Sequence, residues 1–294
     1  MNTPTLTMTA LITPFNKEGT IDFEGFKKLV QYQLDSGIKD LLVLGATGES
    51  LLLDEKEKQE LLEFALKIEG PRWWLGCLEM SLKKAKDLLQ RTASLPLQGY
   101  VILVPPYIKA TQSDIEYYFR SLLDISAHPC ILYNNPSRCS VNASESTLGA
   151  LFDHPQLAGV KDCDLHPLRL WRLREKMKPH HFLLVGDDAY LPGALCHGAN
   201  GIIAVLSNTF PLLTKNIVEG CLSAPWHENC QKWLKVCNLI DSLGNPRGIK
   251  SLLNILLGTS ISLKDPLQSI TEKELQNLQK ELQLAGFIPT KDLV

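Results

Sequence analysis

The stretch Leu157-Ala158-Gly159-Val160-Lys161-Asp162 places a lysine at the end of a short apolar run. Pro155 precedes the run and Asp164 follows it, and an apolar run of this length between turn-forming residues predicts a buried strand. Lys161 would then stand against an apolar wall, where desolvation favours the neutral amine. A neutral amine can attack a carbonyl carbon. Alternatively, the lysine pairs with a neighbouring carboxylate or extends its amine to the rim of the fold.

Seven further apolar runs recur along the chain, separated by polar, helix-like segments. Strands that alternate with helices in this way predict βαβ units and a parallel sheet. Eight units in roughly 215 residues have the size of a closed barrel, so the expected fold class is an α/β, (β/α)8 TIM barrel. An open doubly wound sheet usually has a glycine-rich turn after its first strand, and Thr13-Pro14-Phe15-Asn16 is not one. The further runs are Thr7 to Thr13, Leu41 to Gly45, Trp73 to Cys77, Tyr100 to Val104, Cys130 to Tyr133, Phe182 to Gly186 and Gly201 to Val205.

Start and stop signals predict the helices. Asp22 precedes a segment whose apolar residues share one helical face, and Gly198 is expected to follow the end of a helix. A polar cap three positions before a glutamate marks a helix start. The pairs with this spacing are Asp54 with Glu57, Ser113 with Glu116, and Thr271 with Glu274.

The strand pattern fades after residue 212, and helical patterns replace it. We therefore expect a catalytic barrel over residues 1–220 and a C-terminal helical extension over residues 221–294. The helices expected here are Leu213 to Leu222, Asn229 to Leu243, Gly248 to Leu257 and Thr271 to Ala285.

The totals describe an ordinary soluble protein. The 294 residues are 45% hydrophobic and 21% charged, with a net charge of −2, which gives no reason to expect nucleic acid or an anionic membrane as partner. Met1-Asn2-Thr3-Pro4 lacks the pattern of a signal peptide. No cysteine pair has CxxC spacing, which favours reduced thiols in a cytoplasmic protein. The eight cysteines are at positions 77, 130, 139, 163, 196, 221, 230 and 237.

Candidate site residues follow three of the expected strands, where parallel barrels place their chemistry. The turn Gly45-Ala46-Thr47-Gly48-Glu49 offers N–H groups and the Thr47 hydroxyl to an anion, although an ordinary tight turn has the same pattern. Tyr133 and Lys161 end neighbouring strands, so the phenol could relay protons beside the amine, or simply pack. Arg138 suits a substrate carboxylate, or is a solvated loop charge.

The histidines show no metal-binding spacing. The chain contains neither HxH nor HExxH, and the pair Asp187-Asp188 lacks further ligands nearby in the sequence. This argues against a metal-assisted aldolase and leaves the amine to activate a carbonyl. We expect no metal and no cofactor.

Five motifs, in register from about residue 7 to residue 257, resemble the dihydrodipicolinate synthase/N-acetylneuraminate lyase family. The resemblance implies a (β/α)8 barrel that assembles as a homotetramer of two tight dimers. It also implies a lysine that forms a Schiff base with pyruvate. The motifs are Thr9-Ala10-Leu11-Ile12-Thr13-Pro14-Phe15, Gly45-Ala46-Thr47-Gly48-Glu49, Tyr133-Asn134-Asn135-Pro136-Ser137-Arg138, Gly159-Val160-Lys161-Asp162 and Gly186-Asp187-Asp188.

The Tyr-Asn-x-Pro-Ser-Arg form is typical of the synthase branch. That branch condenses pyruvate with L-aspartate 4-semialdehyde in lysine and diaminopimelate biosynthesis, whereas the neuraminate lyases usually lack the arginine. By resemblance, the catalytic residues are the Schiff-base Lys161 and the proton-relay Tyr133. The substrate-binding residues are Thr47 for the pyruvate carboxylate, Arg138 for the carboxylate of the second substrate, and Gly186 and the Ile203 backbone as pocket lining.

Two positions depart from the family's proton relay. Ala46 stands where the synthases usually have a threonine, and Ile108 stands where a tyrosine normally reaches in from the partner subunit. Water or the preceding Tyr107 could substitute. These departures leave two alternatives open: another pyruvate-dependent aldolase, such as an N-acetylneuraminate or 2-keto-3-deoxy sugar acid lyase, and a lapsed member that binds a keto acid.

The family's allosteric lysine pocket is also altered. Lys84 replaces the carboxylate that meets the ammonium of the effector, so like charge disfavours binding. We expect weak or absent inhibition by lysine. The matching positions hold Ser50, Glu55, Lys58, Met80, Lys84 and Tyr107.

Overall fold

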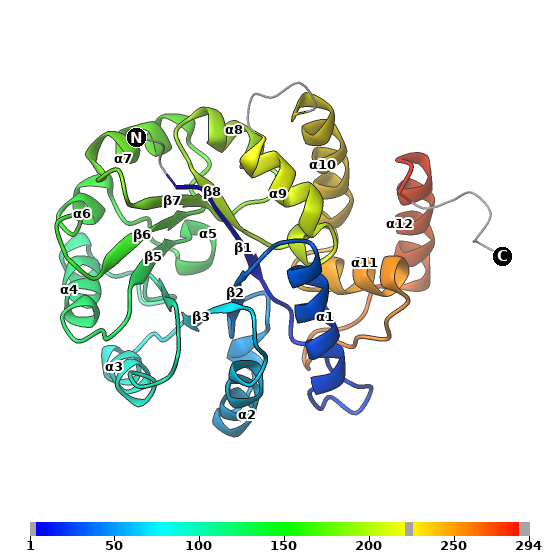
Figure 1. Cartoon of the computed structure of the whole chain (residues 1–294), viewed down its shortest axis with the longest axis horizontal. Coiled ribbons are helices and arrows are strands. Elements are labelled where there is room, and N and C mark those ends of the chain that lie inside the picture. Colours follow the sequence, from blue (N-terminus) through cyan, green and yellow to red (C-terminus); the bar gives the residue numbers. More distant parts are fainter. Residues whose placement is uncertain (1–3, 221–225, 288–294) are drawn as a thin grey trace.

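The computed structural model describes residues 4–220 and 226–287. Eight parallel strands close into a barrel in sequence order, with β8 beside β1, and helices surround it (Figure 1). The expected TIM-barrel fold is confirmed. The strands are β1 (Leu6–Ala10), β2 (Asp40–Val43), β3 (Arg72–Cys77), β4 (Gly99–Leu103), β5 (Cys130–Asn134), β6 (Leu157–Asp162), β7 (Phe182–Val185) and β8 (Gly201–Ala204).

Burial on both faces explains why the strands read as continuous apolar runs. Every residue of β2, β4, β5 and β8 is buried, because one face fills the barrel and the other packs under helices. Each of the eight expected runs overlaps an observed strand. The same packing fixes which strand ends meet at the rim, and so positions the site.

Side-chain caps mark the start of several helices. Asp54 and Glu57 form a capping box at α2 (Glu55–Leu66), as Thr271 and Glu274 do at α12 (Glu272–Leu284), which confirms both predictions. Gly198 has a left-handed φ of 94° just after α8. The helices up to residue 219 are α1 (Phe23–Asp35), α2 (Glu55–Leu66), α3 (Leu82–Arg91), α4 (Gln112–Leu123), α5 (Pro136–Cys139), α6 (Glu145–Gly149), α7 (Pro167–Lys176), α8 (Leu191–Cys196) and α9 (Pro211–Glu219), with short 3-10 turns η1 (Ser50–Leu52) and η2 (Leu206–Asn208).

The predicted box of Ser113 with Glu116 is wrong. The cap of α4 is Thr111, whose Oγ1 accepts from the Asp114 N–H at 3.3 Å, while Asp114 Oδ2 accepts from the Thr111 N–H at 2.9 Å. The helix therefore starts one residue before Ser113. The pairs Thr111–Asp114 and Ser113–Glu116 overlap in this stretch, and Thr111–Asp114 makes both reciprocal hydrogen bonds of a capping box.

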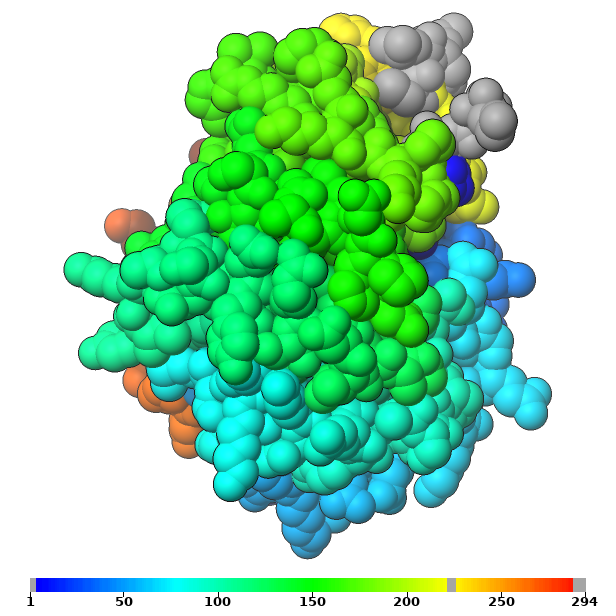
Figure 2. Space-filling view, turned by 90° about the vertical axis from the view of Figure 1, so that its left-hand side faces the viewer, coloured from blue at the N-terminus to red at the C-terminus, as the bar shows by residue number. Residues whose placement is uncertain are grey.

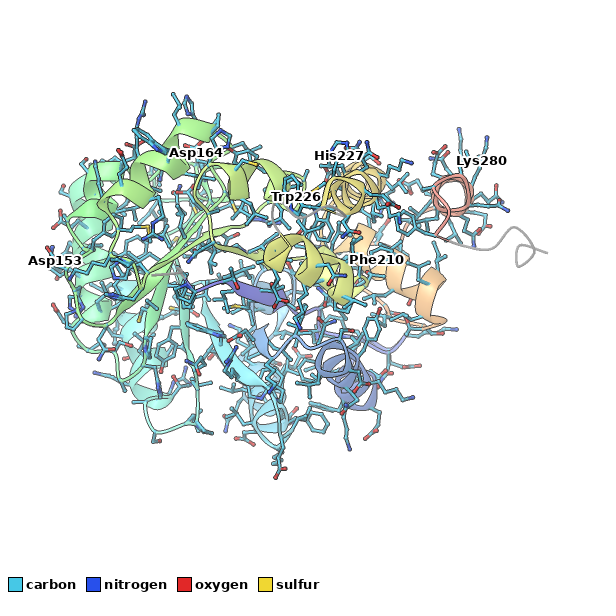
Figure 3. All side chains as sticks on the ribbon, turned by 45° about the horizontal axis from the view of Figure 1, so that its top comes forward. Asp153, Asp164, Phe210, Trp226, His227 and Lys280 are labelled. Carbon is cyan, nitrogen blue, oxygen red and sulfur yellow. The ribbon has the colours of Figure 1, made fainter. Side chains whose placement is uncertain are left out.

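Among the described residues, three helices follow the barrel and lie beside it: α10 (Trp226–Asp241), α11 (Arg247–Leu257) and α12 (Glu272–Leu284) (Figure 1). The Trp226 indole donates to the Ile217 carbonyl at 3.1 Å, which ties α10 to α9 (Figure 3). The ring centroids of Phe210 and Phe287 are 5.1 Å apart, so the end of the described chain also contacts the start of α9. The expected boundary at 220/221 and the last residues of the helix predicted over Leu213 to Leu222 lie outside the described residues.

The side of the molecule at the left of Figure 1 follows the chain order, from cyan segments at the bottom to green segments toward the top (Figure 2). Within the described ranges, no helix has the length and apolar character needed to cross a bilayer. Cysteine 221 lies outside the described residues. The free thiols include Cys77, Cys130, Cys139, Cys163, Cys196 and Cys237.

Candidate active site

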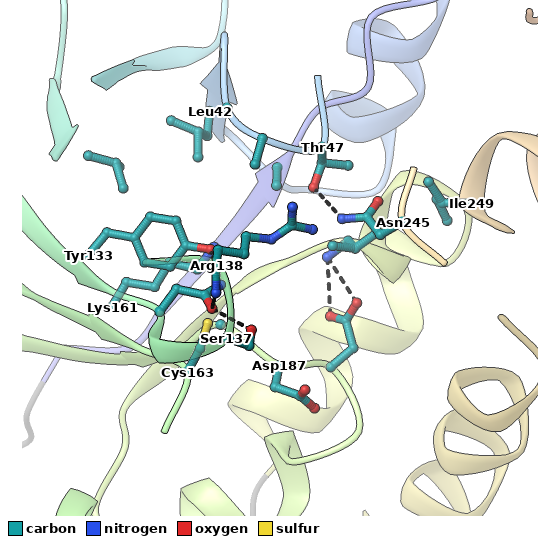
Figure 4. A pocket seen from close by; sticks show the side chains of 18 of the residues that line it. Leu42, Thr47, Tyr133, Ser137, Arg138, Lys161, Cys163, Asp187, Asn245 and Ile249 are labelled. Atoms are coloured by element: carbon teal, nitrogen blue, oxygen red, sulfur yellow. Dashed lines mark hydrogen bonds between the residues drawn. The ribbon is translucent and has the colours of Figure 1, made fainter. Parts of the chain in front are cut away.

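A cavity of about 420 Å³ opens at the C-terminal end of the barrel strands (Figure 4). Its floor comes from the strand ends, and α10 and α11 with the turn between them supply one wall. Both the barrel and the C-terminal helices are therefore needed to build it. The lining residues include Ala46, Thr47, Tyr133, Asn135, Ser137, Arg138, Lys161, Cys163, Gly186, Asp187, Asp188, Val205, Ile240, Asp241, Asn245 and Ile249.

Lys161 lies in this cavity beside Tyr133. The β5–β6 register pairs the two residues directly, and the Lys161 Nζ is 4.2 Å from the centroid of the Tyr133 ring. The lysine is 5% exposed, and its amine makes no hydrogen bond or ion pair with any described residue. Burial lowers its pKa; the nearby Cys163 and Asp188 oppose this effect, and the Arg138 charge adds to it. The amine is thus biased toward its nucleophilic form.

The alternative in which Lys161 pairs with a neighbouring carboxylate does not occur. Asp162, the next residue, points to the other face of the strand and pairs with Arg169 at 2.8 Å, and both side chains are buried. The alternative of an amine at the rim fails as well, because Lys161 is buried. The lysine is left facing the cavity.

Gly186 makes room for the reactive side chain. A Cβ at this position would lie 2.4 Å from Cε of Lys161 and 2.4 Å from the sulfur of Cys163. No real Cβ contact is that short, so any larger residue would displace the lysine. The predicted role as pocket lining thus has a steric basis.

The hydroxyl of Tyr133 has an amide and a thiol as neighbours. The Asn135 Nδ2 donates to it at 2.8 Å, and the Cys163 thiol is near enough to raise the pKa of the phenol. Burial raises the pKa of this phenol, so it keeps its proton until a reacting group takes it. This arrangement suits general acid–base work on a substrate bound to Lys161.

Thr47 lies within the turn after β2 and is 4% exposed. Its Oγ1 accepts a hydrogen bond from Asn245 Nδ2 at 3.0 Å, and Figure 4 shows this bond bridging the barrel and the C-terminal helices. The N–H groups of Gly48 and Glu49 donate within the turn. Those of Ala46 and Thr47 make no hydrogen bond in the described structure, so they remain available to an anion.

Arg138 is exposed at the cavity wall. Asn135 caps the short helix α5 by accepting from the Arg138 backbone N–H at 3.2 Å, which aims the arginine side chain over the cavity. The guanidinium has no carboxylate partner among the described residues. It is therefore free to bind the carboxylate of a ligand.

Of the other predicted residues, one lines the cavity and the rest do not. Ala46 lines the cavity, so the space for a threonine hydroxyl holds a methyl group. Ile203 is fully buried in β8 and is not among the lining residues; Val205, two positions on, is. Tyr107 and Ile108 are exposed and do not line the cavity of this chain.

Sequence reasoning gave no role to Asp188. The Asp188 carboxylate accepts from the backbone N–H groups of Val205 at 3.1 Å and Leu206 at 2.9 Å. The backbone carbonyl of Asp188 accepts from the Trp233 indole at 2.6 Å. Burial raises the pKa of Asp188 to about 7, although both N–H groups lower it. Its place beside Lys161 could not be read from the Asp187-Asp188 pair alone.

Sequence reasoning also missed the ion pair between Glu49 and Lys250. Both side chains are 1% exposed, and the Lys250 Nζ also donates to the Ser262 carbonyl at 2.8 Å. Glu49 Oε2 accepts from the Lys264 N–H at 2.9 Å. These bonds fix the turn that carries Thr47 to α11 and the segment after it.

Comparisons with known proteins support the barrel fold. Residues 4–285 match the model of the Dihydrodipicolinate synthetase family. A 4-hydroxy-tetrahydrodipicolinate synthase of Chlamydia pneumoniae is 33% identical over 92% of both chains, and one of Chlamydia caviae is 35% identical over 84% of both. The crystal structure of dihydrodipicolinate synthase from Thermotoga maritima superposes with a TM-score of 0.90 at 26% identity, covering 98% of this chain and 100% of that one. A monomeric dihydrodipicolinate synthase variant also gives a TM-score of 0.90 at 26% identity, covering 97% of each chain.

Proposed function

The chain belongs to the Dihydrodipicolinate synthetase family, and we propose that it is a 4-hydroxy-tetrahydrodipicolinate synthase that joins pyruvate to L-aspartate 4-semialdehyde. One observation carries the proposal: Lys161 is buried without a hydrogen-bond or ion-pair partner among the described residues, and it faces a cavity that also holds Tyr133 and Arg138. The reaction would serve lysine and diaminopimelate biosynthesis.

The site residues give each step of this reaction a group to perform it. The Lys161 amine attacks the pyruvate carbonyl, and loss of water gives a Schiff base. The Thr47 turn holds the pyruvate carboxylate through its free N–H groups. Loss of a methyl proton gives an enamine, which adds to the aldehyde while Arg138 binds the carboxylate of the second substrate. The amino group of the product then displaces Lys161 and closes the ring, with Tyr133 moving the protons.

A substrate comparison tests this proposal. Pyruvate consumption is measured with L-aspartate 4-semialdehyde, and pyruvate release is measured from N-acetylneuraminate and from 2-keto-3-deoxy sugar acids. We expect turnover with the semialdehyde and at most traces with the sugar acids, because the unpaired guanidinium of Arg138 suits a short carboxylated aldehyde. The reverse preference would identify a lyase instead, and no turnover with any of them would support a lapsed, ligand-binding member.

We also propose that the protein forms the homotetramer of two tight dimers that its family implies, in the cytoplasm, where its buried cysteine thiols would stay reduced. Tyr107 supports an interface between copies, because this large aromatic side chain is 84% exposed and its backbone holds a left-handed φ of 74°. One similar structure is that of a monomeric variant, so a monomer is the competing oligomeric state. Sedimentation would decide: a monomer at micromolar concentration contradicts the proposal.

Inhibition by lysine is proposed to be weak or absent. Glu55, a carboxylate that could bind an ammonium group, already pairs with Lys58 at 2.9 Å and with Arg91 at 3.5 Å. Lys84 lines a groove together with Glu55, Glu79, Asp87 and Arg91. The proposal rests on Lys84 itself, whose charge repels an ammonium group where the family places a carboxylate. Half-inhibition at micromolar lysine in a steady-state assay would show this proposal to be wrong.

A further inference from the structure

The phenol of Tyr133 has a single proton-exchanging partner in the described structure. Its side chain is 6% exposed, its hydroxyl accepts from the Asn135 amide at 2.8 Å, and the Cys163 thiol is near enough to raise its pKa. An amide N–H orients the phenol but does not give up its proton near neutral pH. A buried phenol that has donated its proton must recover one before the next step. The thiol is the neighbour that can supply it.

Cys163 lines the cavity together with Tyr133 and Lys161. It follows Lys161 by two residues at the end of β6, and residues two apart on an extended chain share a face. Its sulfur and Lys161 Cε border the same small space, since each would be 2.4 Å from a Cβ at Gly186. Figure 4 shows the sulfur on the cavity side, and the residue is partly exposed there, whereas Tyr133 is buried. The thiol can therefore reach both the phenol and cavity water.

We propose that Cys163 is the relay residue that passes protons between Tyr133 and solvent during the reaction on Lys161. The proposal rests on the proposed function and adds a group to its chemistry. It also accounts for Ala46, whose methyl group lines the cavity and can carry no proton.

The relay moves protons without net gain or loss. When a substrate alkoxide forms, the O–H bond of Tyr133 breaks as the substrate O–H bond forms. The S–H bond of Cys163 breaks as the Tyr133 O–H bond is restored, and the thiolate takes a proton from cavity water. The methyl proton lost in enamine formation travels the same path in reverse. The proton released in that step balances the proton consumed in the aldehyde addition.

The surroundings of Cys163 keep it in the form that the relay needs. Burial raises its pKa to about 11; the Lys161 charge and the Tyr133 hydroxyl lower it, and the carboxylates of Asp162 and Asp187 raise it. At neutral pH the group is therefore a thiol that can donate, and the thiolate is a short-lived state. A permanently ionised sulfur would pair with Lys161 and keep the amine charged.

Two measurements on the full-length protein test the relay. Borohydride trapping with pyruvate reports Schiff-base formation at Lys161. Exchange of the pyruvate methyl protons in D₂O, followed by proton NMR without any aldehyde, reports the proton transfer alone. For Cys163→Ala we expect trapping to the wild-type extent and methyl exchange slower by about 10- to 100-fold. For Cys163→Ser, whose hydroxyl also carries a proton, we expect exchange within about threefold of wild type.

A matched control uses Cys130, which is buried in β5 outside the cavity lining and donates to Ser126 Oγ at 3.2 Å. Cys130→Ala should exchange pyruvate protons at the wild-type rate. Equal exchange rates for wild type and Cys163→Ala would overturn the relay, as would a serine variant no faster than the alanine one. If Cys163→Ala fails to fold, the equally sized pair Cys163→Thr and Cys163→Val decides in the same way. Absence of trapping in the wild-type protein would instead overturn the proposed function.

Discussion

Two buried lysines of this chain have similar surroundings and different partners. Lys161 is 5% exposed and Lys250 is 1% exposed, and each amine lies over an aromatic ring, at 4.2 Å from the centroid of Tyr133 and 4.3 Å from that of Phe15. Burial lowers the pKa of both, that of Lys250 to about 8 against the opposing charge of Glu49.

The partners of the two amines distinguish a structural lysine from a candidate catalytic one. The Lys250 amine is bound by Glu49 and the Ser262 carbonyl, so its charge is compensated and it joins α11 to the turn after β2. The Lys161 amine has no such partner in the described ranges, and it faces a cavity. A buried lysine is thus informative about function when its amine is left without compensation.

Removing each lysine should have opposite consequences. Lys161→Ala should lower kcat for the condensation by on the order of 10³-fold or more, because no other amine reaches the carbonyl. Its melting temperature should stay at or above that of the wild type, since an unpartnered buried amine is removed. Residual kcat above a tenth of wild type would show that Lys161 is not the nucleophile.

Lys250→Met should lower the free energy of unfolding by about 3–5 kcal/mol, because Glu49 would be left as a buried, uncompensated charge. Denaturant unfolding measures this cost. The double variant Glu49→Gln/Lys250→Met is the control and should lose less than the single one, since no charge remains buried. If Lys250→Met unfolds at the wild-type midpoint, the ion pair between Lys250 and Glu49 does not stabilise the fold.

Gly186→Ala should slow borohydride-trappable imine formation by about 10- to 100-fold, because the added methyl group displaces the Lys161 side chain. Gly149→Ala is a matched control: the nearest atom to its new Cβ is Lys176 Cδ at an ordinary 3.9 Å. Trapping rates from quenched time courses compare the two variants. Equal rates for Gly186→Ala and wild type would mean that the lysine does not need this space.

The pH dependence should be the smallest effect. Imine formation needs the neutral amine, so its rate should rise with pH through the pKa of Lys161 and then level off. Because burial lowers that pKa, the midpoint should lie below the ordinary lysine value of about 10.4. Initial trapping rates over a pH series at saturating pyruvate measure it. A midpoint at or above the ordinary value would mean that the amine is solvated.

Local patterns predicted the fold well because they are properties of short segments. Apolar runs between turn formers located the strands, and the boxes at Asp54 and Thr271 located two helix starts. The pattern was ambiguous where two caps overlapped, and Thr111 rather than Ser113 begins α4.

The site was predictable where residues end neighbouring strands, as Tyr133 and Lys161 do. Contacts between distant segments were not. Asn245 reaches Thr47 across 198 positions, and Lys250 meets Glu49 across a similar span, without any spacing that marks either pair. The influence of Cys163 on the pKa of Tyr133 depends on how two neighbouring strands pair, which the sequence does not state.

Peptide mapping after borohydride reduction tests the central claim most directly. The protein is incubated with pyruvate, reduced and digested, and every lysine peptide is weighed. We predict a reduced pyruvate adduct on the peptide containing Lys161 and none on the peptide containing Lys250. An adduct on Lys250, or an unmodified Lys161 after complete reduction, would contradict the account.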